Sequence, residues 1–189
     1  SLVYHDSPYG KEPIPTLQVL AKKHGFTFTP IPVTHPGVEQ KSQWLAIRRD
    51  RTNWIYLQGW GAMNPTAVKE AVKNSFPMDK LVGVWWAGGD DDARAGEAGG
   101  KGYKSLSFNG VGTEFGVIKD IQKHVVDKGL SKFPKERIGE NLYNRGVYNS
   151  MLVAEAIRTA QQITGKKLVT GEDVRRGFEN LNITEARLK

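Results

Sequence analysis

Residues 54–61 read Trp54-Ile55-Tyr56-Leu57-Gln58-Gly59-Trp60-Gly61, an apolar run that ends in a loop of glycine, glutamine and tryptophan. Similar runs with glycine-containing loops occupy residues 2–10 and 81–89. A short apolar run bounded by turn residues predicts a buried strand, and each of these three is followed by a helical pattern. Successive strand–helix units predict an α/β fold, an open parallel sheet with helices on both faces.

Residues 27–33 alternate and are rich in β-branched and aromatic residues, which predicts a further strand. Its prolines at positions 30 and 32 place it at an edge of the sheet. A helix is predicted from the prolines at 13 and 15 to a left-handed cap at Gly25, and another from Asn64, which can cap it, and Pro65 onward. The other predicted elements are helices over 38–50 and 90–98 and a strand over 103–108.

Beyond residue 110 the pattern becomes almost entirely helical. Apolar residues at helical spacing predict helices over 113–128 and 141–163, and Thr170-Gly171-Glu172-Asp173 resembles a capping box that begins a last helix. We therefore divide the chain into an α/β lobe, residues 1–109, and a helical segment, residues 110–189, with the hinge near 109–112.

The composition excludes several classes of protein. The chain has 189 residues and no cysteine, which excludes thiolate chemistry, disulfides and cysteine-ligated zinc. No segment has the length of apolar sequence that a membrane helix needs, and residues 1–3 do not have the charged start of a signal peptide. Because Ser1-Leu2-Val3 enters a strand at once, we expect the chain to be a piece of a longer protein.

The net charge of +7 raises nucleic acid as a partner. The lysines and arginines, however, are scattered along predicted helices among glutamate and aspartate. A nucleic-acid-binding protein more often clusters its basic residues with exposed aromatics. We therefore interpret these lysines and arginines as solvated helix faces and expect no nucleic-acid partner.

Candidate catalytic and metal sites are weak. Asp90-Asp91-Asp92 could hold a divalent cation, but three carboxylates also suit the start of a helix, which we favour. Gly59-Trp60-Gly61 lacks the lysine and serine of a phosphate-binding loop. His5, Asp6 and Ser7 are adjacent, so their side chains alternate across a strand and cannot form a triad. We expect no catalysis, no metal and no cofactor.

The tryptophans give the clearest indication of a binding site. Trp44, within a helical stripe, and Trp54, at a strand start, are expected in the core, whereas Trp60, Trp85 and Trp86 fall at or beyond strand ends. Because adjacent residues alternate across a strand, we expect at most one of the last two to pack below the sheet edge while the other faces the crevice. Ligands of open parallel sheets bind at this edge.

Several stretches, in this order, resemble the type I periplasmic solute-binding proteins, and more narrowly the branched-chain amino acid (leucine/isoleucine/valine) ABC-transporter group. They are Val3-Tyr4-His5-Asp6-Ser7-Pro8-Tyr9-Gly10, Tyr56-Leu57-Gln58-Gly59, Phe108-Asn109-Gly110, Tyr143-Asn144-Arg145-Gly146-Val147-Tyr148 and Ala154-Glu155-Ala156-Ile157. The resemblance implies a periplasmic, ligand-capturing subunit of a bacterial ABC importer, which works with membrane permease subunits. Two lobes would close on one small molecule.

In that family, residues 1–109 would be the second lobe, and residues 110–189 would cross the hinge and return helices to the first. Helices without their native sheet could pack on the present lobe or on a second copy of the chain, so the oligomeric state stays open. An alternative with the same fold is the ligand-sensing domain of a receptor or transcriptional regulator. An α/β enzyme would need an acid–base pair, for which the sequence offers only His5 and Asp6.

The resemblance also implies positions for the ligand. The family's amino-acid binders hold the ligand's ammonium with the loop after the third strand, here Gln58-Gly59-Trp60, and with a carboxylate that falls here on Trp85 or Trp86. Because a buried ammonium needs a charge partner, we expect an aromatic or apolar carboxylate rather than a branched-chain amino acid. The expected ligand-binding residues are Asp6, Tyr9, Gln58, Trp60, Trp85, Trp86 and Phe108.

Overall fold

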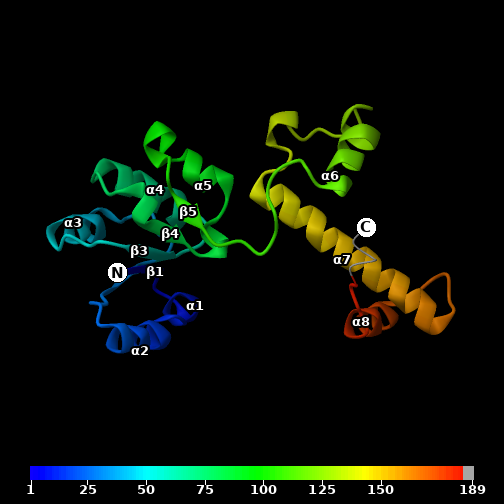
Figure 1. The fold of residues 1–189 in the computed structure, drawn as a ribbon, viewed down its shortest axis with the longest axis horizontal. Coiled ribbons are helices and arrows are strands. Elements are labelled where there is room, and N and C mark those ends of the chain that lie inside the picture. The colour runs from blue at the N-terminus through cyan, green and yellow to red at the C-terminus, as the bar shows by residue number, and fades with distance from the viewer. Residues whose placement is uncertain (185–189) are drawn as a thin grey trace. The chain divides into compact units, whose positions relative to one another are not determined.

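The computed structural model describes residues 1–184, and the chain divides into two compact units. The α/β unit comprises Ser1–Gly110 and Glu140–Leu142. The helical unit comprises Val111–Gly139 and the chain from Tyr143 onward. Figure 1 shows the sheet of the first unit and the long helix α7 of the second.

The α/β unit contains the predicted open parallel sheet, in the order β2-β1-β3-β4-β5. All neighbouring strands pair in parallel. The edge position of the proline-containing strand is confirmed, and residues 27–29 lie outside it. The strands are β1 (Leu2–His5), β2 (Pro30–Val33), β3 (Ile55–Gln58), β4 (Leu81–Gly83) and β5 (Lys104–Ser105).

Helices cover the sheet unequally. Helices α1 (Pro8–Lys11) and α2 (Ile14–His24) lie on the opposite side from α4 (Met63–Lys73), as Figure 1 shows. No residue of α2 is fully buried, whereas α4 buries six. The main apolar core therefore lies on the side of α4, where α3 (Lys41–Arg49) adds Trp44 and Ile47.

The core prediction is correct for Trp44 and wrong for Trp54. Trp44 is fully buried, and its indole N–H donates to Gln40 Oε1 at 3.1 Å. Trp54 is 51% exposed, and Lys80 Nζ lies 4.4 Å from its ring centroid. The reason is position: β3 begins at Ile55, so Trp54 precedes the buried part of the strand.

Two further predicted boundaries are wrong. The last strand has two exposed residues instead of spanning 103–108, because an edge strand gains few ladder bonds. Helix α5 (Asp90–Arg94) ends before the predicted 98, and a separate 3₁₀ turn, Glu97–Gly100, follows it. By contrast, the left-handed cap at Gly25 (φ 71°) is confirmed.

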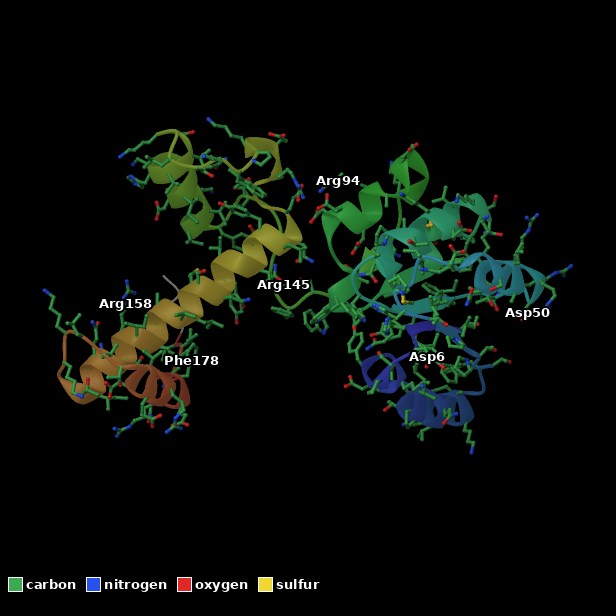
Figure 2. The ribbon with its side chains drawn as sticks, turned by 180° about the vertical axis from the view of Figure 1, so that it is seen from behind. Asp6, Asp50, Arg94, Arg145, Arg158 and Phe178 are labelled. Carbon is green, nitrogen blue, oxygen red and sulfur yellow. The ribbon has the colours of Figure 1, made fainter. Side chains whose placement is uncertain are left out.

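The helical unit contains α6 (Gly116–Ile121), continued by a π-helical turn at Gln122–Val126, then α7 (Asn141–Thr164) and α8 (Gly171–Glu179). The predicted capping box is confirmed: Thr170 and Asp173 exchange side-chain to backbone hydrogen bonds. Gly177 allows α8 to approach α7, since a Cβ there would lie 2.1 Å from the Ala156 carbonyl oxygen. Phe178 beside it is labelled on α8 in Figure 2.

Candidate functional site

An aromatic pocket of about 490 Å³ lies at the carboxyl ends of β1 and β3. Its lining residues are His5, Ser7, Pro8, Tyr9, Trp60 and Trp86. Carboxyl ends of parallel strands are where this architecture binds ligands. The pocket therefore lies where the sequence predicts a site, and its walls are mainly aromatic.

Local geometry at the end of β1 forms one wall. The Ser7 hydroxyl accepts a hydrogen bond from the Gly10 backbone N–H at 3.3 Å and caps the short helix α1. Gly10 packs directly on β1, because a Cβ at this position would lie 1.7 Å from the His5 carbonyl oxygen. A glycine is thus required for α1 to hold Tyr9 against the strand end.

The tryptophans form a continuous series of ring contacts. The ring centroids of Trp60 and Trp86 lie 6.5 Å apart, and Tyr9 lies 6.0 Å from Trp86. Trp85 contacts Trp86 at 5.1 Å and Phe108 at 5.5 Å. Trp85 and Phe108 extend this series beyond the pocket lining.

The predicted alternation of the two adjacent tryptophans is wrong. Trp85 and Trp86 are 37% and 48% exposed, so neither packs below the sheet edge. Strand β4 ends at Gly83, and Trp85–Ala87 forms a 3₁₀ turn. Alternation applies only to extended backbone, so the turn leaves both rings at the surface.

Three buried polar side chains at the pocket or bonded to the backbone of its lining have an atom without a hydrogen-bond partner in the described part of the chain: His5 Nδ1, Gln58 Oε1 and Asn64 Oδ1. The Gln58 amide otherwise makes only a 3.4 Å contact to the Tyr9 carbonyl. A buried polar group without a partner costs about 1–3 kcal/mol. These atoms mark a place where a ligand or water would complete the hydrogen bonding.

The sequence misassigned Asn64 as a helix cap. Helix α4 begins at Met63 after Ala62, so Asn64 lies inside the first turn. Its side-chain N–H donates to the Trp86 carbonyl at 3.0 Å and fixes the tryptophan turn on α4. An asparagine before a proline looks the same in the sequence whether its side chain caps a helix or bonds a distant carbonyl. The sequence therefore could not distinguish the two roles.

His35 is a residue that the sequence interpretation missed. His5 Nε2 and His35 Nδ1 lie 3.2 Å apart, and both rings contact Trp60, at centroid distances of 5.3 and 5.9 Å. Burial first, and then His35, lower the pKa of His5, against an opposing effect of Asp6. Parallel pairing of β1 with β2 brings the two histidines together.

Two other expected residues have different surroundings. The Asp6 carboxylate lies 2.6 Å from Lys11 Nζ in a half-exposed ion pair, and it does not line the pocket; Figure 2 labels it. Tyr9 lines the pocket, and burial raises the pKa of its phenol to about 12. Tyr9 is therefore a neutral group at physiological pH.

The three consecutive aspartates have separate roles. Asp90 Oδ2 accepts the backbone N–H of Asn141 at 2.8 Å. Asp91 Oδ1 lies 2.6 Å from Arg94. Asp92 is half-buried beside Asn64, and burial raises the pKa of its carboxyl to about 6. No metal-binding cluster of three or more acidic, histidine or cysteine side chains occurs among residues 1–184.

Asn141 is the centre of a polar clasp, which we define as Asp90, Arg94, Asn109, Glu140 and Asn141. The Asn141 amide donates to the Gly88 carbonyl at 2.6 Å, and its Oδ1 accepts from Asn109 at 3.0 Å. Arg94, labelled in Figure 2, bonds Glu140 through two nitrogens at 2.9 and 3.3 Å. The clasp thus joins residues 88–94 to the segments near 109 and 140.

No helix among the described residues has the length and apolar character needed to cross a membrane.

Comparisons with known proteins place the chain in a family. The model of a family described as periplasmic binding protein matches residues 1–188. A structure described as an ABC transporter permease from the Pseudomonas fluorescens group is 40% identical, with a TM-score of 0.86, over 99% of this chain and 45% of that chain. No curated protein matches.

Two more distant structures show the same fold. A branched-chain amino acid ABC transporter from Thermus thermophilus with bound valine has 22% identity and a TM-score of 0.73, over 96% of this chain and 46% of that chain. An R. palustris ABC transporter solute-binding protein in complex with benzoate has 16% identity and a TM-score of 0.65, over 94% and 45%. The present chain spans less than half the length of these structures.

The family model covers nearly all of the sequence, and the fold agrees with it. The chain therefore belongs to the periplasmic binding protein family, a family of solute-binding proteins rather than enzymes.

Proposed function

We propose that this chain is the ligand-binding second lobe, with part of the first, of an extracytoplasmic solute-binding subunit of an ABC importer. The aromatic pocket at the strand ends carries the proposal. Residues 1–109 form the solute-binding lobe, and residues 110–189 cross the hinge and complete the other lobe in the full-length protein. The protein acts in the periplasm, binds one small organic solute and delivers it to membrane permease subunits.

The solute we favour is an aromatic or apolar carboxylate. The pocket lining contains no carboxylate to pair with the ammonium of an α-amino acid. Asp6, the nearest candidate in sequence, is already paired with Lys11. A buried ammonium without a charge partner costs several kcal/mol, whereas an aromatic ring stacked on Trp60 or Trp86 gains about 0.5–1.5 kcal/mol beyond its burial.

The family tolerates such a change of solute. The solved structures similar to this chain include a protein with bound valine, one in complex with benzoate, and a fatty acid ABC transporter substrate-binding protein from Thermomonospora curvata. An acidic head with an apolar body is common to all three solutes. What differs is the ammonium, for which the pocket described here has no partner.

Capture would proceed by closure of the two lobes. In the open state the exposed faces of Trp60 and Trp86 receive the solute. The polar clasp anchors the start of α7 to residues 88–94, directly after the tryptophan turn. Contact of a solute with Trp86 would therefore act on the segment that also anchors one end of the hinge.

A thermal-shift screen of the full-length protein tests the proposal. Benzoate, hexanoate and leucine are compared at concentrations far above the expected dissociation constant, where a bound solute stabilises by about 2.7 kcal/mol at a hundredfold excess. We expect benzoate to raise the melting temperature and leucine to leave it unchanged. Stabilisation by leucine alone would contradict the proposed solute class.

A matched pair of variants locates the site. Trp60→Ala should weaken benzoate binding, while Trp54→Ala should not, although both tryptophans are exposed. Trp54 lies outside the aromatic pocket and so controls for general effects of removing an indole. Equal losses of affinity in the two variants would place the solute elsewhere.

A further inference from the structure

The imidazoles of His5 and His35 form a pair beside Trp60. His5 Nε2 and His35 Nδ1 are 3.2 Å apart, which is hydrogen-bonding distance. The two rings meet edge to face, with an interplanar angle of 77°, and the His35 ring is stacked on Trp60 at 27°. The pair therefore has a defined geometry and lies at the wall of the aromatic pocket.

The backbone around His35 is fixed by packing. His5 is in register with Val33, and the Val33 carbonyl accepts the Asp6 backbone N–H at 2.9 Å. The loop then turns at Gly37, which has a φ of 90° and donates to the Thr34 carbonyl. A Cβ at Gly37 would lie 2.5 Å from Met63 Cβ, so the loop is pressed against α4.

Proton counting shows what such a pair can do. In its neutral form one proton lies between the two facing nitrogens, and only one of the two outer nitrogens, His5 Nδ1 or His35 Nε2, carries a hydrogen. Adding one proton makes both outer nitrogens donors and keeps the central hydrogen bond. A second added proton would place two N–H groups against each other at 3.2 Å. The pair therefore accepts a single proton.

The surroundings of the pair favour a proton only when an anion is present. His5 is 5% exposed, and its Nδ1 has no partner among the described residues. Asp6 is the nearest acid, and Lys11 neutralises it. From α4, Met63 packs against Gly37 and Asn64 against Gly59, and neither carries a charge. Tyr9 of α1 is neutral, and Glu39 is the one acid in the exposed loop beyond His35. Burial disfavours an isolated cation here, and a bound carboxylate would offset that cost.

We propose that the His5–His35 pair recognises the carboxylate of an acidic solute and takes up one proton when that solute binds. The inference rests on the proposed function and assigns the charge partner of the solute within this lobe. Trp60 supports the protonated state, because its ring is stacked on His35 and its centroid lies 5.3 Å from that of His5, and an aromatic face attracts a cation. Affinity for acidic solutes then rises as the pH falls, although the solute itself stays ionised.

Calorimetric titration of the full-length protein with benzoate, from pH 5.5 to 8, tests this. Uptake of one proton predicts an increase in affinity of about tenfold for each pH unit lowered, over the range where the free pair is neutral and the complex is protonated. Titrations in two buffers with different heats of ionisation should give about one proton bound. Benzamide, which has the same ring and no charge, should bind with an affinity independent of pH.

His35→Gln is the decisive variant, because His35 is exposed and its replacement leaves the sheet intact. Glutamine keeps an N–H donor but cannot be protonated, so benzoate should bind with a reduced, pH-independent affinity. His24→Gln, an exposed histidine at the end of α2, should retain the wild-type pH dependence.

The outcomes separate the inference from the proposed function. Benzoate that binds wild-type protein equally at all pH values would overturn the proton uptake and leave the solute class standing. An unchanged pH dependence in His35→Gln would overturn the role of the pair. Absence of benzoate binding to wild-type protein at every pH would contradict both proposals, and it would be seen before any variant is made.

Discussion

The aromatic pocket and the polar clasp lie in the same α/β unit, and they differ in whether their buried polar atoms have hydrogen-bond partners. In the clasp, Asn141 uses its backbone N–H and its side-chain amide for bonds to three residues, Gly88, Asp90 and Asn109. At the pocket, one lining residue, His5, keeps a buried atom without a partner in the described chain. Gln58 and Asn64, which donate to the Tyr9 and Trp86 carbonyls, do the same. The contrast separates a part that the fold completes by itself from one that a solute completes.

The clasp should show the largest response to mutation. Asn141→Ala removes the donor to the Gly88 carbonyl and the acceptor for Asn109. We expect the free energy of unfolding to fall by about 2–3 kcal/mol, because buried polar groups lose their partners. Urea denaturation measures the loss.

Ser107→Ala provides the graded control. Its hydroxyl donates to the same Asn141 oxygen at 3.0 Å, but Asn109 remains as a donor after the change. The loss should stay below about 1 kcal/mol. If the two variants were equally stable, the clasp would not be a structural anchor.

The pocket should respond in affinity rather than in stability. Trp86→Ala removes a half-exposed ring that contacts Trp60 and Tyr9. We expect benzoate affinity to fall about tenfold, which is 1.4 kcal/mol, with little change in the urea midpoint. Calorimetry and denaturation on the same sample check both parts, and a large loss of stability would assign Trp86 to the core.

Asp92 lies between the two regions and gives a prediction about pH. Its folded pKa of about 6 is above the ordinary value of 3.8, because the carboxyl is buried. Between these values the folded state holds a proton that the unfolded state has lost. The contribution of Asp92 to the free energy of unfolding is therefore largest at low pH and declines as the pH rises towards 6. The decline should be at most about 2 kcal/mol after allowance for solvent.

Asp92→Asn should remove this decline, and the difference between the two proteins isolates it from the opposite contribution of His5. The lowered pKa of His5 makes stability rise with pH over a similar range. If the difference in free energy of unfolding between wild type and Asp92→Asn were constant from pH 4.5 to 7, the assignment to Asp92 would be contradicted.

The smallest expected effect is also the most diagnostic of a binding site. Gln58→Met replaces a buried amide, whose oxygen has no hydrogen-bond partner in the described chain, by an apolar side chain of similar length. The Tyr9 carbonyl keeps its bond from the Glu12 N–H. We expect stability without solute to rise by about 0.5–1 kcal/mol while benzoate affinity falls. A loss of stability would show that Gln58 serves the fold.

The sequence predicts the fold well where burial decides the outcome. Strands β1, β3 and β4 are short apolar runs, and the parallel order follows from their alternation with helices. Predictions are wrong where a residue lies just outside such an element. Trp54 precedes its strand and is exposed, and Trp85 and Trp86 follow theirs in a turn.

The site could be predicted only in part. Aromatic residues at strand ends are visible in the sequence, and Tyr9, Trp60 and Trp86 do line one pocket. The partnership of His5 with His35 depends on the register of β1 and β2, and the role of Asn141 depends on a contact with residues about 50 positions earlier. Such long-range contacts leave no local pattern of residues.

The segment from Trp85 to Asp92 contains both a pocket tryptophan and the anchors of the clasp. Trp86 lines the pocket, the Gly88 carbonyl and Asp90 hold Asn141, and Asp92 lies beside Asn64. An inserted or deleted residue between these positions would shift one set of contacts relative to the other. In evolution, solute preference at this edge should therefore change by substitution of side chains at fixed loop length.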